Sequence, residues 1–115
     1  MIKEMDFACP CCGANKISLQ LVSLIQSLEH HIGEDLTITS GFRCPKHNKD
    51  KEVGGSPTSS HLKGLAVDIA AADLRLYFFI IYWSIFLGIT RMGLGKNFIH
   101  LDIDPGKTQE VVWRY

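Results

Sequence analysis

The sequence has no excess of charge of either sign. Its 115 residues carry twelve basic and twelve acidic side chains, so the formal net charge is zero. A neutral chain has no strong electrostatic attraction for nucleic acid or for an anionic membrane surface. We therefore expect no nucleic-acid partner, and a substrate that is neutral or is matched only locally by charged side chains.

The sequence also lacks a hydrophobic run of membrane-spanning length. The most apolar stretch, 76–90 (LYFFIIYWSIFLGIT), falls short of the roughly 20 residues that cross a bilayer, so we expect no transmembrane segment. Strand-like segments on both sides favour a buried core helix here. Its many aromatic residues leave an exposed apolar face, and with it a contact to a partner or a membrane surface, as the alternative.

No signal peptide is evident near the start. Residues 1–6 carry charge, and no apolar stretch with a small-residue cleavage site follows them. We expect the chain to be synthesised in the cytoplasm without a signal peptide.

Length and periodicity predict one α+β domain over residues 1–115. Apolar residues recur at helical spacing after Ser18, which predicts a helix capped by Ser18 that runs to about His31 and ends at Gly33. Alternating or apolar segments predict a small, mostly antiparallel sheet with flanking helices. These strand segments are 36–40, 65–71, 98–103 and 111–115, with a further short segment near 89–94.

The segment from Cys44 to Lys63 is rich in Gly, Pro, Ser, Lys and Asn and has no apolar run. This composition predicts a long surface loop, and long loops in small domains are usually functional or disordered.

Polar residues interrupt two of the apolar strands. Asp68 lies inside the strand that follows His61, and burying an ionised carboxylate costs several kcal/mol, roughly, unless a cation or dense hydrogen bonding compensates. His100 occupies the centre of another apolar strand. Two imidazoles and one carboxylate leave zinc a fourth position for water, although a single strand histidine is more often a satisfied core residue.

Three motifs resemble one enzyme family. Residues 59–68 (SSHLKGLAVD) resemble the S-x-H-x-x-G-x-A-x-D signature of the D-alanyl-D-alanine carboxypeptidase family of zinc peptidases, peptidase M15. Residues 98–102 (FIHLD) resemble its F-[IV]-H-x-D segment, and 40–45 (SGFRCP) its S-G-[FY]-R-x-P turn. The three matches occur in the family's order, and the resemblance covers about 7–115.

The resemblance implies a fold shared with lysostaphin-type peptidases and the hedgehog signalling domain. It also implies zinc bound by His61, Asp68 and His100 and hydrolysis of a peptide bond in peptidoglycan stem peptides, by a carboxypeptidase or an endopeptidase. Small size suits a phage or prophage-type lysis protein, or endolysin, that acts at the cell wall after release. Residues 46–58 would set how the groove closes beyond the scissile bond.

The same matching gives roles to two further residues. Arg43 would point into the site and stabilise the oxyanion or hold a substrate carboxylate, as its planar fork allows. A salt bridge that braces the loop is the alternative for Arg43. Ser59 matches a substrate-contacting serine, and a hydroxyl that caps a turn is its alternative.

The chain departs from the family pattern at Asn97. Many members have Asp or Glu three residues before the last histidine ligand, and an amide cannot act as a general base. Asp102 is our candidate for the catalytic base, because residues two apart in a strand share a face with each other. An equally weighted role is to orient His100, and His47 is a weaker candidate base. A zinc-containing module that binds wall peptide or a protein partner with little or no cleavage is the alternative function.

The four cysteines allow several states. Cys9 and Cys12, together with Cys44 and His47, have the ligand types and pair spacing of a structural zinc site. Free thiols and a disulfide are the alternatives.

Overall fold

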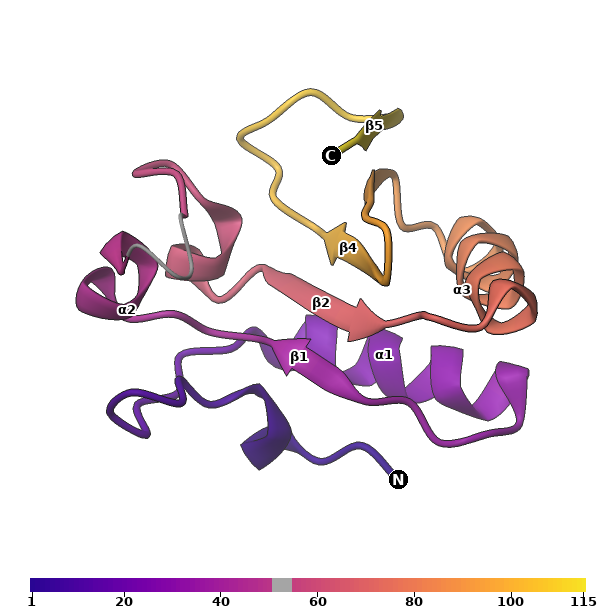
Figure 1. Cartoon of the computed structure of the whole chain (residues 1–115), viewed down its shortest axis with the longest axis horizontal. Helices are drawn as coiled ribbons and strands as arrows, with labels where there is room; N and C mark the ends of the chain where they lie inside the picture. Colours follow the sequence, from indigo (N-terminus) through magenta and orange to yellow (C-terminus); the bar gives the residue numbers. More distant parts are fainter. Residues whose placement is uncertain (51–54) are drawn as a thin grey trace.

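The computed structural model describes residues 1–50 and 55–115, which form an α+β fold as predicted (Figure 1). Its helices are α1 (Leu19–Ile32), α2 (Pro45–Lys49) and α3 (Leu74–Phe86), with two short 3-10 helices, η1 (Glu4–Phe7) and η2 (Ser60–Lys63). Its strands are β1 (Ile38–Ser40), β2 (Ala66–Ala70), β3 (Arg91–Leu94), β4 (Phe98–Asp102) and β5 (Val111–Arg114).

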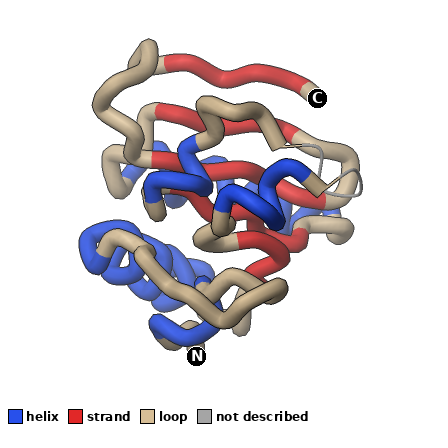
Figure 2. The backbone as a smooth tube through the Cα atoms, turned by 90° about the vertical axis from the view of Figure 1, so that its left-hand side faces the viewer, coloured by secondary structure: helices blue, strands red, loops and turns tan. Residues whose placement is uncertain are grey.

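The five strands form one sheet in the order β1-β2-β4-β3-β5 (Figure 2). All neighbouring pairs are antiparallel except β3 and β5, which run parallel at the edge. The prediction of a mostly antiparallel sheet with flanking helices is therefore confirmed. The strands predicted at 36–40, 65–71, 98–103 and 111–115 are present and shorter by one to two residues.

The two faces of the sheet differ in chemistry because successive side chains on a strand point to opposite sides. Val67 and Ile69 of β2, with Ile99 and Leu101 of β4, belong to the hydrophobic core shared with α1 and α3. The residues between them, which include Asp68, face the other side. Helices α1 and α3 thus support one face of the sheet, and polar side chains occupy the other.

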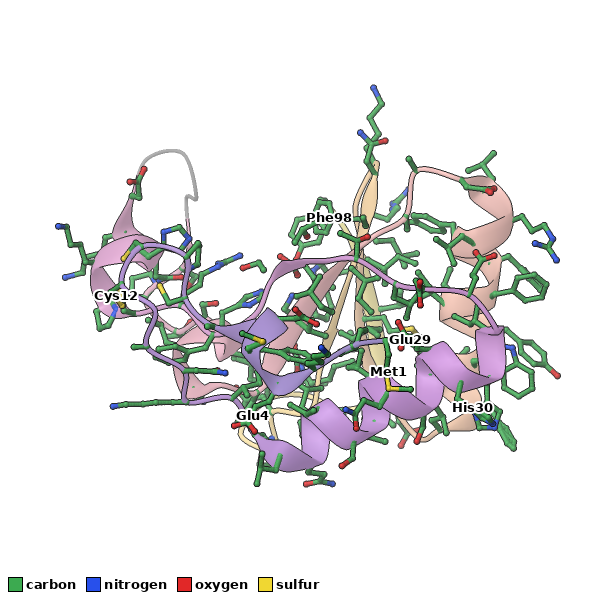
Figure 3. The ribbon with its side chains drawn as sticks, turned by 90° about the horizontal axis from the view of Figure 1, so that it is seen from below. Met1, Glu4, Cys12, Glu29, His30 and Phe98 are labelled. Carbon is green, nitrogen blue, oxygen red and sulfur yellow. The ribbon has the colours of Figure 1, made fainter. Side chains whose placement is uncertain are left out.

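Helix α1 begins and ends where its sequence indicates. The Ser18 hydroxyl accepts a hydrogen bond from the amide of Leu21, and Gly33 adopts the left-handed conformation, with φ of 81°, that closes the helix. Its buried Glu29 accepts hydrogen bonds from the amides of Ile2 and Leu36, at 2.9 and 3.0 Å, and holds the start of the chain against the helix (Figure 3).

Helix α3 is apolar on all sides but is not buried on all sides. Ile80 and Ser84 are fully buried, whereas Phe78 and Ile85 are 59% and 61% exposed. The side of α3 that meets α1 and β4 is buried, as predicted for a core helix, and its other side is the exposed apolar face that was the alternative. Among the helices in residues 1–50 and 55–115, none combines the length and the apolar character that a membrane span requires.

The segment predicted as one long loop, from Cys44 to Lys63, contains two short helices. Pro45 takes the first position of α2, where its missing N–H costs nothing, and the side chain of Cys44 caps the helix. Ser59 caps η2, which ends at Gly64 in the left-handed conformation. The loop prediction is wrong at these two places, and its residues 51–54, part of the predicted groove segment 46–58, lie outside the described residues.

Candidate metal centre

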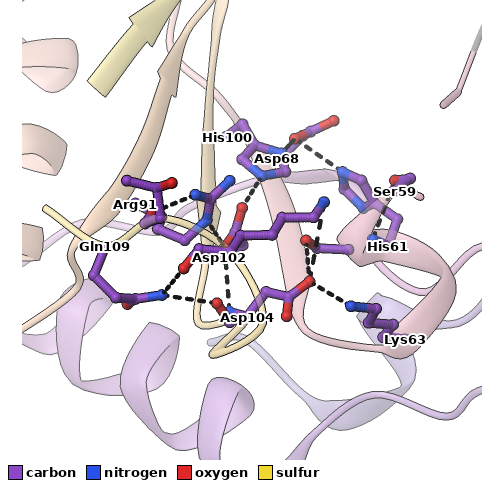
Figure 4. Close-up of polar contacts among 12 residues, drawn as sticks. Ser59, His61, Lys63, Asp68, Arg91, His100, Asp102, Asp104 and Gln109 are labelled. Carbon is purple, nitrogen blue, oxygen red and sulfur yellow. Dashed lines mark hydrogen bonds and ion pairs between the residues drawn. The ribbon is translucent and has the colours of Figure 1, made fainter. Parts of the chain in front are cut away.

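Three of the predicted site residues converge on the polar face of the sheet (Figure 4). Asp68 of β2 pairs directly across the sheet with His100 of β4, and His61 enters from η2. The Nδ1 atom of His100 lies 2.9 Å from Asp68 Oδ1, and the Nε2 atom of His61 lies 3.3 Å from the same oxygen. All three side chains are buried, and their ligand atoms lie within 4.8 Å of one another.

The outer nitrogen of each imidazole has a partner of its own. His61 Nδ1 lies 2.8 Å from the carbonyl oxygen of Gly41, and His100 Nε2 lies 2.7 Å from Asp102 Oδ2. Because both partners are acceptors, each outer nitrogen donates its proton, and in the neutral form of each ring the inner nitrogen presents a lone pair towards Asp68. Three acceptor atoms then meet at one point, which requires either a bridging proton or a cation. This donor set fits a metal such as zinc, with a neutral histidine pair and one carboxylate.

The ionisation of these groups agrees with a position that attracts positive charge. Burial raises the pKa of the Asp68 carboxyl, but its contacts with His100 and His61 outweigh burial and hold the pKa well below the ordinary value. Burial lowers the pKa of the His100 imidazole, whereas its hydrogen bonds with Asp102 and Asp68 raise it, and the net pKa is above the ordinary value. A metal that binds here must displace the proton that His100 shares with Asp68.

Asp102 is buried behind His100 and is engaged at both carboxylate oxygens. Oδ2 accepts from His100, and Oδ1 accepts from Arg91 Nε at 2.6 Å and from the amide of Asp104 at 3.2 Å. Burial raises the pKa of Asp102, but His100 and Arg91 hold it below the ordinary value. The side chain therefore lies on the far side of the imidazole from Asp68.

Arg43 reaches the same centre and is braced as well. Its guanidinium donates to Ser40 Oγ at 3.0 Å and to Asn48 Oδ1 at 3.3 Å, and NH2 lies 3.4 Å from Asp68 Oδ2. The two roles considered for Arg43, a group pointing into the site and a brace for its loop, are thus both compatible with its position.

Ser59 and Ser60 hold the helix that carries His61. The Ser59 hydroxyl accepts from the amide of His61 at 3.2 Å, so it acts as a turn cap, and Ser59 also lines the cavity. Ser60 donates to Asp104 Oδ2 at 2.8 Å, and Lys63 Nζ lies 3.0 Å from the same oxygen. Asp104 thereby ties η2 to the segment that follows β4.

A cavity of about 550 Å³ opens beside the three candidate ligands. Cationic and aromatic side chains share its lining, among them Arg43, Lys107, Phe98, Trp113 and Tyr115. The ring of Trp113 lies 5.4 Å from that of His100, over the backbone of Gly93. A Cβ atom at Gly93 would come within 2.6 Å of Trp113 Nε1, so only glycine leaves this space to the indole.

The candidate bases occupy different places. Asn97 and His47 line a second hollow of about 400 Å³, next to Arg43 and Asp68. In the main cavity, Asp68 and Asp102 are the only carboxylates among the lining residues that the structure describes.

Arg91, Asp104 and Trp113 were not predicted as site residues from the sequence. Two of them did carry a signal in the sequence. Arg91 interrupts a mostly apolar segment as Asp68 does, and Asp104 continues the alternation of polar residues begun by His100 and Asp102. Trp113 carried no such signal, because an aromatic residue is ordinary in an edge strand.

The cysteines gather at a second place. The Sγ atoms of Cys9, Cys11, Cys12 and Cys44 all lie within 4.8 Å of one another. In the described part of the chain, no ligand atom of His47 joins this group; His47 contributes only a backbone amide, which donates to Cys44 Sγ at 3.4 Å. Cys11 therefore takes the place predicted for His47, because the turn at Gly13 brings it back towards Cys44.

Comparisons with known proteins agree with this picture. The sequence model of one family, described as Peptidase M15, matches residues 2–102. The matched range contains all three candidate ligands. A search of curated proteins finds no match to the chain.

Proposed function

The chain belongs to the peptidase M15 family and is thus a metallopeptidase by descent, and from this premise we propose that it hydrolyses a peptide bond in peptidoglycan stem peptides. In this proposal zinc is held by His61, Asp68 and His100. The convergence of their three acceptor atoms, each imidazole held from behind, is the observation that supports it most directly.

Zinc in such a set of ligands lowers the pKa of water to about 7 and polarises a carbonyl group. The chain supplies the other parts of the reaction. Arg43 presents its guanidinium beside Asp68, where it can bind a substrate carboxylate or the developing oxyanion. Phe98 and Trp113 line the cavity with aromatic surface and limit the access of water to it.

We assign Asp102 the role of orienting His100 rather than that of general base. Asp102 contributes to the cavity lining, but its side chain is 1% exposed and both of its oxygens already accept hydrogen bonds, so neither is free to take a proton from water there. A carboxylate behind a ligand imidazole also selects the tautomer that binds a metal and increases its basicity.

The substrate assignment rests on the charge of the cavity. Lys107 lines it together with Arg43 and Arg91, which are paired with Asp68 and Asp102, and the indole of Trp113 lies 5.0 Å beneath the guanidinium of Arg91. A short peptide with a free carboxylate, such as the end of a stem peptide, matches this combination of cationic and aromatic surface. We propose action at the cell wall after release of the protein.

One observation favours a second function, a zinc-containing module that binds wall peptide or a protein partner with weak or no cleavage. No carboxylate free of other partners is found among the cavity-lining residues that the structure describes, and position 97 carries an amide. General-base catalysis contributes on the order of 10²- to 10⁴-fold to rate, so its loss would leave a slow enzyme.

Metal analysis and mass-spectrometric digestion of purified peptidoglycan test the proposal together. The native protein is compared with His61→Ala and with His30→Ala, a control in which an exposed histidine of α1 is removed. New stem-peptide products from the native protein and His30→Ala, lost together with zinc in His61→Ala, would support the enzyme. Zinc and wall binding without products would favour the binding module, and absence of zinc from the native protein would disprove both.

A further inference from the structure

The second cluster of potential ligands lies apart from the candidate centre, at the end of the molecule that carries α2. We propose that Cys9, Cys11, Cys12 and Cys44 bind a zinc ion with a structural role. Figure 3 shows Cys12 beside α2, whose cap residue is Cys44. The two groups of ligands share no residue.

The spacing of the sulfur atoms fits one tetrahedral ion. A zinc–sulfur bond of about 2.3 Å places neighbouring sulfurs of a tetrahedron about 3.8 Å apart. The Sγ atoms of Cys9 and Cys11 are 3.7 Å apart, those of Cys11 and Cys44 are 3.2 Å apart, and all four lie within 4.8 Å of one another. Small movements of the side chains would therefore complete the coordination.

The backbone around the thiols is built to hold them in this position. The amide of Cys9 donates to the carbonyl of Ala14, and the amide of Gly13 donates to the carbonyl of Cys9, both at 2.8 Å. Gly13 has φ of 75°, which a residue with a side chain rarely adopts. This tight turn returns the chain so that three cysteines within four residues face one point.

Backbone amides also point at the sulfur atoms. The amide of Cys44 lies 3.5 Å from Cys9 Sγ, and that of His47 lies 3.4 Å from Cys44 Sγ. Such amides stabilise thiolates, which are the form that binds metal. Two segments more than thirty residues apart in sequence thus contribute both ligands and the donors that support them.

The chemistry of the group favours zinc in a closed site. Four thiolates are soft ligands in a set that binds zinc in structural sites, with no position left for water. Cys11 and Cys12 are exposed, so burial of apolar surface does not explain why they gather here. A shared cation gives a reason for the arrangement.

The ion would join the N-terminal segment to the loop that carries Arg43. The amide of Phe42 donates to the carbonyl of Phe7 at 2.7 Å, and a Cβ atom at Gly41 would come within 2.5 Å of that carbonyl oxygen. The ion would add a further link between these two segments, through Cys44, one residue beyond Arg43. It would thereby hold the first residues of the chain against the loop that positions the guanidinium.

Zinc counting on the full chain with two matched variants tests the inference. We expect two equivalents of zinc in the native protein, one in Cys44→Ser and one in His61→Ala. Because each variant keeps the other site, failure of the two proposals can be told apart. Native protein with one equivalent, lost in Cys44→Ser but not in His61→Ala, would support the cysteine site and count against the histidine site.

Cobalt substitution tests the inference on the native protein, so the result does not depend on whether a variant folds. We expect the intense charge-transfer absorption of cobalt thiolates, together with release of one zinc equivalent when a mercurial reagent titrates the thiols. The inference would be overturned by one zinc equivalent that survives the Cys44→Ser change. It would equally be overturned if mass analysis of the native protein shows a disulfide among these cysteines.

Discussion

Asp102 lies directly behind His100, with 2.7 Å between Asp102 Oδ2 and His100 Nε2, while the opposite nitrogen of the ring faces Asp68 at 2.9 Å. The imidazole is thus held between two carboxylates. One of them shares the candidate metal position, and the other determines which nitrogen presents its lone pair there. This relationship makes the role of Asp102 accessible to experiment.

We expect Asp102→Ala to weaken zinc binding on the order of 10- to 100-fold, the usual effect of removing a group that orients a ligand. Asp102→Asn should lose less, because the amide oxygen can still accept from His100. Zinc affinity measured by competition with a chelator checks both, with Asp35→Asn, at an exposed position, as the control. If both variants bind zinc normally but lose all hydrolysis, Asp102 is the base instead.

Asn97 is the natural place to restore a missing base. Because general-base catalysis contributes on the order of 10²- to 10⁴-fold, we expect Asn97→Asp to increase the rate of stem-peptide hydrolysis at least tenfold, roughly. Rates on a defined stem peptide, compared with those of Asn97→Ser as a control for the loss of the amide, measure the effect. An unchanged rate would mean that another group already accepts the proton.

The elements that the sequence predicted well are those with a local signal. Ser18 and Gly33 mark the ends of α1, and Asp68 stands out in its strand because nothing apolar can replace the interactions that it makes. The contact between Asp68 and His100 could not be predicted from either segment alone. It depends on the register between β2 and β4.

The features that escaped prediction depend on tertiary contacts. Helix α2 has too few apolar residues to show a period, and the pairing of Arg91 with Asp102 follows from the register of β3 against β4. A helix that is apolar on all sides, as α3 is, does not indicate which face is buried. The geometry of the turn at Gly13 decided that Cys11, not His47, joins the other cysteines.

Arg43 makes three contacts through its own planar guanidinium, so its replacement by lysine should not be conservative. We expect Arg43→Ala to lower kcat/KM on the order of 10²-fold, and Arg43→Lys to recover only a small part of that loss. Steady-state kinetics on the same stem peptide, with Arg75→Ala on α3 as the control, provide the measurement. A lysine variant with native kinetics would show that a single positive charge is sufficient.

Asp104 offers a test of stability rather than of chemistry. Burial raises the pKa of its carboxyl, but contacts with Lys63, Ser60 and the amide of Gly106 lower it to about 2. A carboxyl whose pKa is lower in the folded state than in the unfolded state stabilises the fold above the unfolded value of about 3.9. That contribution is lost as the pH falls towards 2.

We therefore expect Asp104→Asn to reduce the free energy of unfolding by about 1.5–3 kcal/mol at neutral pH, the range for hydrogen bonds to a charged group. The difference from the native protein should shrink as the pH falls from about 4 to about 2, because the native carboxyl becomes protonated there. Urea denaturation at several pH values, with Asp35→Asn as the exposed control, gives both quantities. A difference that stays constant down to pH 2, roughly, would show that packing rather than the charge of Asp104 holds η2 in place.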